Sequence, residues 1–244
     1  MKAGETLQAE NSSGRIAEIV VTKSEKIAHG TMGDIYRIEG MLGSKRVNVI
    51  VKDYARSLTL EDVDEKRTPA ELVAHSFGMY AKVKALEIPT WKTFRRTDKP
   101  GVVLLSEGEK DKSTTIVTQT GESTYAERIY QKVHTITNFA ESVSRALSYA
   151  MKLAEKEIKV PPDAWMFSFT ETGDGVVTLD ISVGDFDSME DSSSASVGDL
   201  DAYNRYALEC EVFNILLMVA PGEYFHKEAK KVRPVFDQFW DFAT

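Results

Sequence analysis

Two glycines mark the first segment of the chain that is suited to chemistry. Gly30 and Gly33 lie in the segment IAHGTMGDIY (residues 27–36), which has a strand–turn–strand context. A glycine has no Cβ, so its backbone can approach a phosphate group closely. A tight hairpin that binds no ligand has the same composition. From these residues alone, a phosphate-binding loop and a plain hairpin are both open.

A lysine and a glutamate follow this segment along the chain. Lys52 ends the apolar strand VIVK (residues 49–52). Burial of an ammonium group is costly, so a lysine here either reaches solvent or has a specific partner. Glu71 lies in the first turn of a helix that Thr68 and Pro69 are expected to begin. Glu71 is therefore either a partner for Lys52 or the glutamate of a capping box.

Taken in this order, the three features resemble the N-terminal part of the protein-kinase-like superfamily. The glycine-rich loop of that family reads G-x-G-x-x-G-x-V. Ala28 stands at the first glycine of this motif, Gly30 and Gly33 match the other two, and Ile35 matches the valine. The resemblance implies that this segment covers the phosphates of a bound ATP.

The same resemblance assigns roles to the lysine and the glutamate. It implies that Lys52 binds the α- and β-phosphates and that Glu71 forms an ion pair with Lys52. It also implies that backbone groups near residues 107–109 meet the adenine, which makes Glu107 a candidate binding residue. The cofactors that follow from the resemblance are ATP and Mg²⁺.

In the second half, the resemblance implies a catalytic loop of the form H-R-D-x-x-x-x-N. Asp163, in the segment PPD (residues 161–163), matches the aspartate that orients the attacking hydroxyl and accepts its proton. Ser168 stands where the metal-binding asparagine is expected, and Pro161 replaces the histidine. A rival alignment shifts the motif by two residues, to Pro161 and Met166, and leaves no catalytic aspartate.

Asp180 follows an apolar strand and is like the metal-binding aspartate of the family's D-F-G motif. Isoleucine and serine take the places of the phenylalanine and the glycine. An aspartate that caps a turn at the end of a strand is the alternative. The letters DFD at residues 185–187 are closer to D-F-G, but we expect no strand immediately before them.

The composition excludes several classes of protein. The 244 residues include 30 Lys and Arg against 38 Asp and Glu, a net charge of −8, which argues against nucleic acid and anionic membranes as partners. The single cysteine, Cys210, excludes an internal disulfide framework. No apolar run reaches the roughly 18 residues of a membrane helix. The first residues do not resemble a secretory signal, so we expect a cytoplasmic protein.

Strands are expected mainly in the first half of the chain and helices in the second. The predicted strands of the first half span about residues 17–22, 34–38, 46–53, 91–96 and 101–106. Between the third and fourth of these, a helix is predicted from Pro69 to about Leu86. The predicted elements of the second half are a helix over 139–154, a hairpin over 165–179, and helices over about 200–219 and 227–242.

We therefore expect an α+β, two-lobed protein-kinase-like fold. The N-terminal lobe is predicted to be a five-stranded antiparallel sheet plus one helix, and the C-terminal lobe to be reduced and mainly helical. The expected boundaries are a flexible N-terminus over 1–14, an N-terminal lobe over 15–108 and a C-terminal lobe over 109–244, with ATP between the lobes.

The expected activity is ATP- and Mg²⁺-dependent phosphoryl transfer to a hydroxyl of a protein or a small molecule. Lys52, Glu71 and Asp180 favour an enzyme. The substituted histidine and asparagine favour a pseudokinase that binds a nucleotide or a partner without turnover. A purely structural interaction domain is the third possibility.

Overall fold

The computed structural model of the chain describes residues 1–30, 33–54, 67–106, 114–117 and 129–240. The chain divides into two compact units. Unit 1 comprises Met1–Ala85 and Thr90–Lys110, and unit 2 comprises Leu86–Pro89 and Asp111–Thr244.

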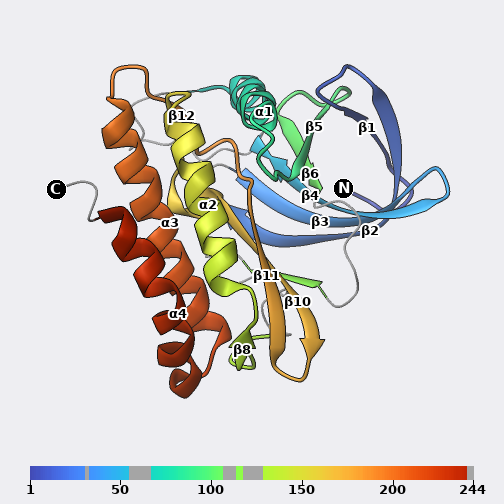
Figure 1. The fold of residues 1–244 in the computed structure, drawn as a ribbon. Coiled ribbons are helices and arrows are strands. Elements are labelled where there is room, and N and C mark those ends of the chain that lie inside the picture. Colours follow the sequence, from blue (N-terminus) through green and yellow to red (C-terminus); the bar gives the residue numbers. More distant parts are fainter. Residues whose placement is uncertain (31–32, 55–66, 107–113, 118–128, 241–244) are drawn as a thin grey trace. The chain divides into compact units, whose positions relative to one another are not determined.

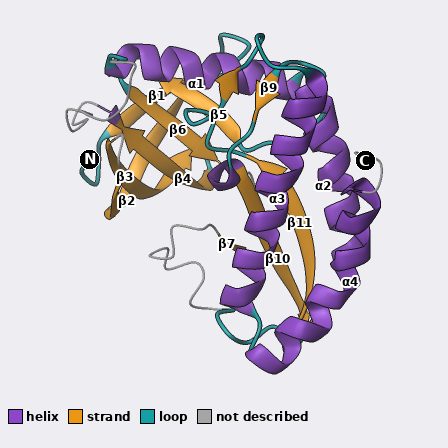
Figure 2. Ribbon diagram, turned by 90° about the vertical axis from the view of Figure 1, so that its left-hand side faces the viewer, coloured by secondary structure: helices purple, strands orange, loops and turns teal. Residues whose placement is uncertain are grey.

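Unit 1 contains a closed antiparallel barrel in the order β1-β2-β3-β4-β6-β5. Its strands are β1 (Thr6–Glu10), β2 (Ile16–Gly30), β3 (Gly33–Leu42), β4 (Lys45–Asp53), β5 (Lys92–Arg96) and β6 (Val102–Ser106). Inward-facing side chains from every strand except β5 form the buried core of the barrel: Leu7, Ala9, Ile19, Val21, Ile38, Val49, Val51, Val102 and Leu104. Alternation of apolar and polar residues along these strands thus places an apolar core inside the barrel that Figure 2 shows as a ribbon.

The N-terminus corrects two expectations. Residues 1–14 were expected to be flexible, but β1 lies within them and buries Leu7 and Ala9. The sheet was expected to have five strands, but β1 adds a sixth and closes the barrel by pairing with both β2 and β5. The sequence TLQAE has only one β-branched residue, so it does not look like a strand. Closure leaves the sheet without exposed edges, which stabilises even so short a strand.

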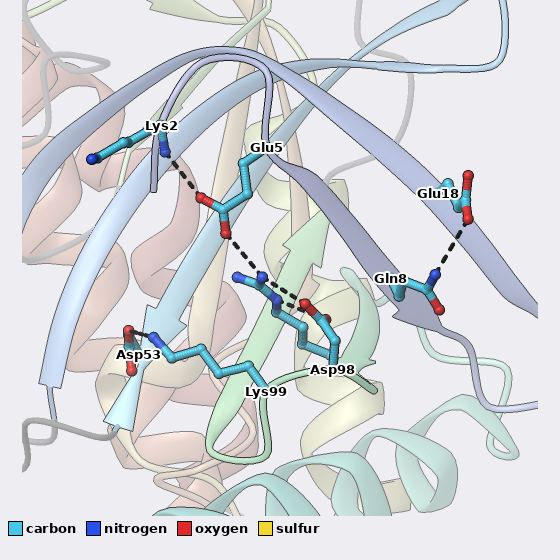
Figure 3. A network of polar contacts seen from close by, with 8 residues as sticks. Lys2, Glu5, Gln8, Glu18, Asp53, Asp98 and Lys99 are labelled. Carbon is cyan, nitrogen blue, oxygen red and sulfur yellow. Dashed lines mark hydrogen bonds and ion pairs between the residues drawn. The ribbon is translucent and has the colours of Figure 1, made fainter.

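A network of charged side chains joins β1 to β5 and to the turn after it (Figure 3). The buried Arg96 guanidinium donates hydrogen bonds to Asp98 at 2.7 and 2.8 Å and to Glu5 at 2.9 Å. Arg95 binds Glu10 in the same bidentate way. The hydrogen bonds from Arg96 lower the pKa of Asp98 and outweigh the opposing effect of its partial burial.

Helix α1 (Pro69–Lys84) packs against β5 and β6 (Figure 2). Thr68 is its N-cap, and Glu71 completes a capping box, as the sequence predicts. Leu72 and Val73 of the helix form a small buried cluster with Tyr54 and Val103. The capping box thus fixes the start of a helix whose apolar face covers the barrel.

Unit 2 combines a four-stranded sheet with three helices. The sheet has the order β7-β10-β11-β8, and a separate pair joins β9 to β12. The strands of unit 2 are β7 (Thr114–Val117), β8 (Thr135–Ile136), β9 (Ile158–Lys159), β10 (Trp165–Gly173), β11 (Val176–Val183) and β12 (Glu190–Asp191). The helices are α2 (Phe139–Ala154), α3 (Val197–Val219) and α4 (Gly222–Trp240), and they pack on one another (Figure 1).

The helices of unit 2 follow the apolar periodicity of the sequence. Helix α2 has the predicted bounds, α3 begins three residues before the predicted start, and α4 begins five residues before it. Ser196 explains the start of α3, because its hydroxyl accepts a hydrogen bond from the backbone N–H of Asp199. None of the helices in the described part of the chain is long and apolar enough to span a bilayer.

Candidate active site

The glycine-rich segment forms the end of the β2–β3 hairpin. Ala28 lies opposite Ile35, and Gly30 lies opposite Gly33. Gly33 has φ +151°, and a Cβ there would lie 2.2 Å from the backbone oxygen of Asp53. Only a glycine permits so close an approach of β3 to the end of β4. Packing therefore accounts for Gly33 whether or not a phosphate binds at this hairpin.

Lys52 lies on β4 next to this hairpin. It stands opposite Ile35 on β3 and opposite Val103 on β6, and it is half-buried. The barrel thus brings Lys52 and Ile35 together, although they are far apart in the sequence. Glu107, the candidate adenine-binding residue, lies outside the described residues.

Glu71 occupies a different place from the one that the resemblance implies. Its carboxylate accepts hydrogen bonds from the backbone N–H of Thr68 at 2.6 Å and from the Thr68 hydroxyl at 2.8 Å. These hydrogen bonds, with a smaller contribution from the charge of Arg67, lower the pKa of Glu71. The side chain is exposed, and in this structure it caps α1 rather than pairing with Lys52.

Two carboxylates that the sequence analysis did not single out lie beside the hairpin. Asp34 and Asp53 stand directly opposite each other on β3 and β4, and both are buried. Two like charges in this position repel each other. Lys26 forms an ion pair with Asp34 at 2.7 Å. Lys99 forms one with Asp53 at 2.5 Å, which Figure 3 shows. The barrel thus holds two ion pairs close to Lys52.

Asp163 lies in unit 2, in the short 3-10 turn η2 (Pro162–Ala164) between β9 and β10. The turn is closed by a hydrogen bond from the N–H of Ala164 to the oxygen of Pro161. Pro162 supplies the φ angle that the first helical position requires. The side chain of Asp163 is exposed. A rigid turn thus presents this carboxylate, as a base or orienting group requires.

Asn204 of α3 holds the segment that leads into this turn. Its side chain is fully buried, accepts a hydrogen bond from the N–H of Val160 at 2.8 Å and donates one to the oxygen of Ile158 at 2.9 Å. It also donates to Ala150 of α2 at 3.3 Å. One amide therefore ties α2, α3 and the segment before Asp163 together. The sequence analysis did not identify it.

Asp185 belongs to the DFD segment, against which the sequence argued. Strand β11 runs to Val183, so the expectation that no strand precedes the DFD segment is wrong. The N–H of Gly184 donates to the oxygen of Ala164 at 2.9 Å, which continues the β10–β11 ladder by one step. Asp163 directly precedes Ala164, and Asp185 directly follows Gly184. Both aspartates therefore lie at the same end of the hairpin, each one residue beyond its last backbone hydrogen bond.

The backbone of Asp185 is unusual for a residue other than glycine. Its φ is 49°, in the left-handed region. Such a conformation costs free energy and often occurs at functional sites. The two residues after it, Phe186 and Asp187, are buried and fix the direction of the chain.

Asp180 and Ser168, the metal ligands that the sequence analysis proposed, lie opposite each other on β10 and β11. Ser168 is buried, whereas the Asp180 side chain is 68% exposed and lies 3.9 Å from Arg145. Ser168 is three residues beyond Trp165, or about 10 Å along the strand. Asp180 and Ser168 therefore lie about three residues along the ladder from the end at which the Asp163 turn lies, and their metal-binding role stays a prediction.

The described residues contain no group of three or more His, Cys, Asp or Glu side chains that could hold a metal ion. Mg²⁺ bound to a nucleotide needs only one or two protein carboxylates, because phosphate oxygens and waters complete its shell. Asp185, at the same end of the β10–β11 hairpin as the Asp163 turn, is a candidate for such a carboxylate.

No family model matches the sequence, and no curated protein matches it. Among solved structures, the chain is similar to the Rio2 kinase from Chaetomium thermophilum, crystallised as an ADP/Mg²⁺-phosphoaspartate complex. The TM-score is 0.51 at 13% sequence identity, and the match covers 87% of this chain and 62% of that chain. This chain thus matches less than two thirds of the Rio2 chain. The likeness extends to the fold, and the fold of this chain is protein-kinase-like.

Proposed function

We propose that the chain is an ATP- and Mg²⁺-dependent phosphotransferase that acts on a hydroxyl of a protein or a small molecule. One observation carries this proposal: the hydrogen bond from Gly184 to Ala164 brings Asp163 and Asp185 to the same end of the β10–β11 hairpin. Phosphoryl transfer needs a carboxylate that orients the acceptor and another that holds Mg²⁺ on the phosphates.

In this proposal, Asp163 accepts the proton of the attacking hydroxyl, and Asp185 holds Mg²⁺. Lys52 of unit 1 binds phosphate oxygens, and Ile35 and the Gly30–Gly33 hairpin contact the nucleotide. Bound Mg²⁺ neutralises the negative charge of the phosphates. The protein-kinase-like fold supports this assignment at the level of fold. The ADP and Mg²⁺ in the Rio2 structure belong to that protein, and they make the same ligands the first choice for a test.

A second function, that of a pseudokinase, is favoured by the position of Glu71. An active kinase holds its strand lysine with a glutamate of the adjacent helix. Here the Glu71 carboxylate is bound to Thr68. A nucleotide-binding module without turnover needs no such ion pair. The two functions differ in turnover and not in binding, so both must be measured.

The binding test is thermal denaturation with ATP, with and without Mg²⁺. A ligand that binds the folded state raises its stability by mass action. We expect Lys52→Ala to reduce the shift and Asp185→Asn to remove its Mg²⁺ dependence. Asp180→Asn is the matched control, because it neutralises an exposed aspartate of the same hairpin. Loss of the Mg²⁺ dependence in Asp180→Asn but not in Asp185→Asn would restore the sequence-based assignment.

The turnover test follows release or transfer of the γ-phosphate in wild type and Asp163→Asn. A kinase predicts transfer that Asp163→Asn strongly reduces, since this carboxylate orients the acceptor. If both proteins bind ATP and neither exceeds background, the pseudokinase is the correct function. Hydroxylamine treatment of the product distinguishes a phosphoester from an acyl phosphate such as phosphoaspartate. A fully active Asp163→Asn would show that the base lies elsewhere.

A further inference from the structure

Glu211 is a buried carboxyl group in the middle of α3, between the buried residues Leu208 and Val212. It is 0% exposed. Its carboxylate oxygens have no hydrogen bond of good geometry among the described residues, and the nearby amide of Asn214 offsets only part of the cost of burial. A buried carboxylate without partners is costly, whereas the neutral acid is tolerated. The placement of this residue therefore requires an explanation.

The geometry of α3 places Glu211 toward the Asp163 turn. Asn204 lies seven residues earlier, which is two helical turns, so the two side chains share one face of the helix. Asn204 contacts Ile158 and Val160, immediately before the turn. Helix α3 also packs directly against η2. The face of α3 that carries Glu211 is thus the face that supports the turn.

Burial raises the pKa of Glu211 to about 7, the amide of Asn214 lowers it by a smaller amount, and the charge of Asp163 raises it further. Asp163 is the charged group among the described residues that acts on Glu211. The interaction is mutual: if the charge of Asp163 disfavours ionisation of Glu211, ionised Glu211 disfavours the charge of Asp163.

Several charged residues on the elements around α3 form ion pairs with one another. On α2, the residues buried against the core are uncharged, and the same holds for the buried part of β10. Among the described residues, the ion pairs of β9, α3 and α4 are Lys159–Glu190, Arg205–Asp201, Lys231–Glu228, Arg233–Glu209 and Arg233–Asp237. None of them changes the pKa of Glu211. The coupling therefore runs between Glu211 and the turn.

We propose that Glu211 is a positioning residue for Asp163. While protonated, its carboxyl group packs as a neutral group behind the Pro162–Ala164 turn. When it ionises, it repels the Asp163 carboxylate and displaces the turn, so that the position of Asp163 depends on pH. The catalytic role of Asp163 rests on the proposed function, but the coupling between the two carboxyl groups does not.

The test is ¹³C NMR of the Asp and Glu carboxyl carbons between about pH 5 and pH 9, with assignments from Asp163→Asn and Glu211→Gln. We expect the Glu211 carbon to titrate within this range and the Asp163 carbon to show a step at the same pH. In Glu211→Gln the step at Asp163 should vanish. The matched control, Glu155→Gln, removes an exposed glutamate of the same unit and should leave the step unchanged.

This measurement needs no substrate, so it separates the inference from the proposed function. Absence of a step at Asp163 in the wild type, or its persistence in Glu211→Gln, overturns the inference. If the proposed kinase activity is found, the rate ratio of Glu211→Gln to wild type should rise by up to about tenfold from pH 6 to pH 8. A flat ratio in an active enzyme would mean that Glu211 is only structural.

Discussion

The hydrogen bonds of Asn204 provide a quantitative test of how α3 supports the Asp163 turn. In Asn204→Leu the branched shape of the side chain is kept, but the N–H of Val160 and the oxygen of Ile158 lose their partner. Asn204 is 0% exposed, so water cannot replace the amide. Each unsatisfied buried group costs about 1 to 3 kcal/mol, and we therefore expect a loss of about 3 kcal/mol in the free energy of unfolding.

Two measurements check this prediction. Urea denaturation gives the loss of stability, and amide hydrogen exchange shows where it arises. Exchange at Val160 should accelerate more than exchange in α1 of unit 1. Ser144→Ala, which changes an exposed residue of α2, should alter stability by less than about 0.5 kcal/mol. If Asn204→Leu behaves like this control and Val160 stays protected, the amide does not hold the turn.

Three further predictions concern both units. Gly33→Ala should destabilise unit 1 by about 2 kcal/mol in urea denaturation, because its Cβ would overlap the backbone oxygen of Asp53; an unchanged midpoint refutes the packing role. Arg96→Met should cost about 1 to 2 kcal/mol by the same assay, since it removes the hydrogen bonds to Asp98, and a neutral effect would mean that barrel closure does not depend on them. Because the pKa of Glu211 is 4.5 unfolded and about 7 folded, stability should fall by about 3 kcal/mol from pH 4.5 to pH 7, and Glu211→Gln should abolish this fall in pH-dependent denaturation.

Local signals in the sequence were sufficient for several elements. The N-terminus of α1 needs only Thr68 and Pro69, and the helix begins there as predicted. The apolar stripe of α2 predicts a helix over residues 139–154, and the structure has that helix. These features depend on residues three or four apart, so the chain specifies them before any long-range contact forms.

The alternation in β11 also contained a signal for Asp185. Val177, Leu179, Ile181 and Val183 are buried in turn, which extends the strand to the residue before Gly184. The same alternation places Asp180 on the exposed face. If the two-residue alternation is followed to Val183, Asp180 falls within the strand and Asp185 falls after its end.

Other features required the tertiary structure. The sequence of β1 does not predict a strand, but long-range pairing with β5 closes the barrel and makes it one. Glu71 satisfies the pattern of a helix cap and that of a lysine partner equally well. In the folded chain its carboxylate accepts a hydrogen bond from the hydroxyl of Thr68. The reason is that pairing between distant segments selects among conformations that local propensity leaves nearly equal in free energy. The placement of Asp163 and Asp185 at the same end of the β10–β11 hairpin is of the same kind, because it depends on the backbone hydrogen bond between Gly184 and Ala164.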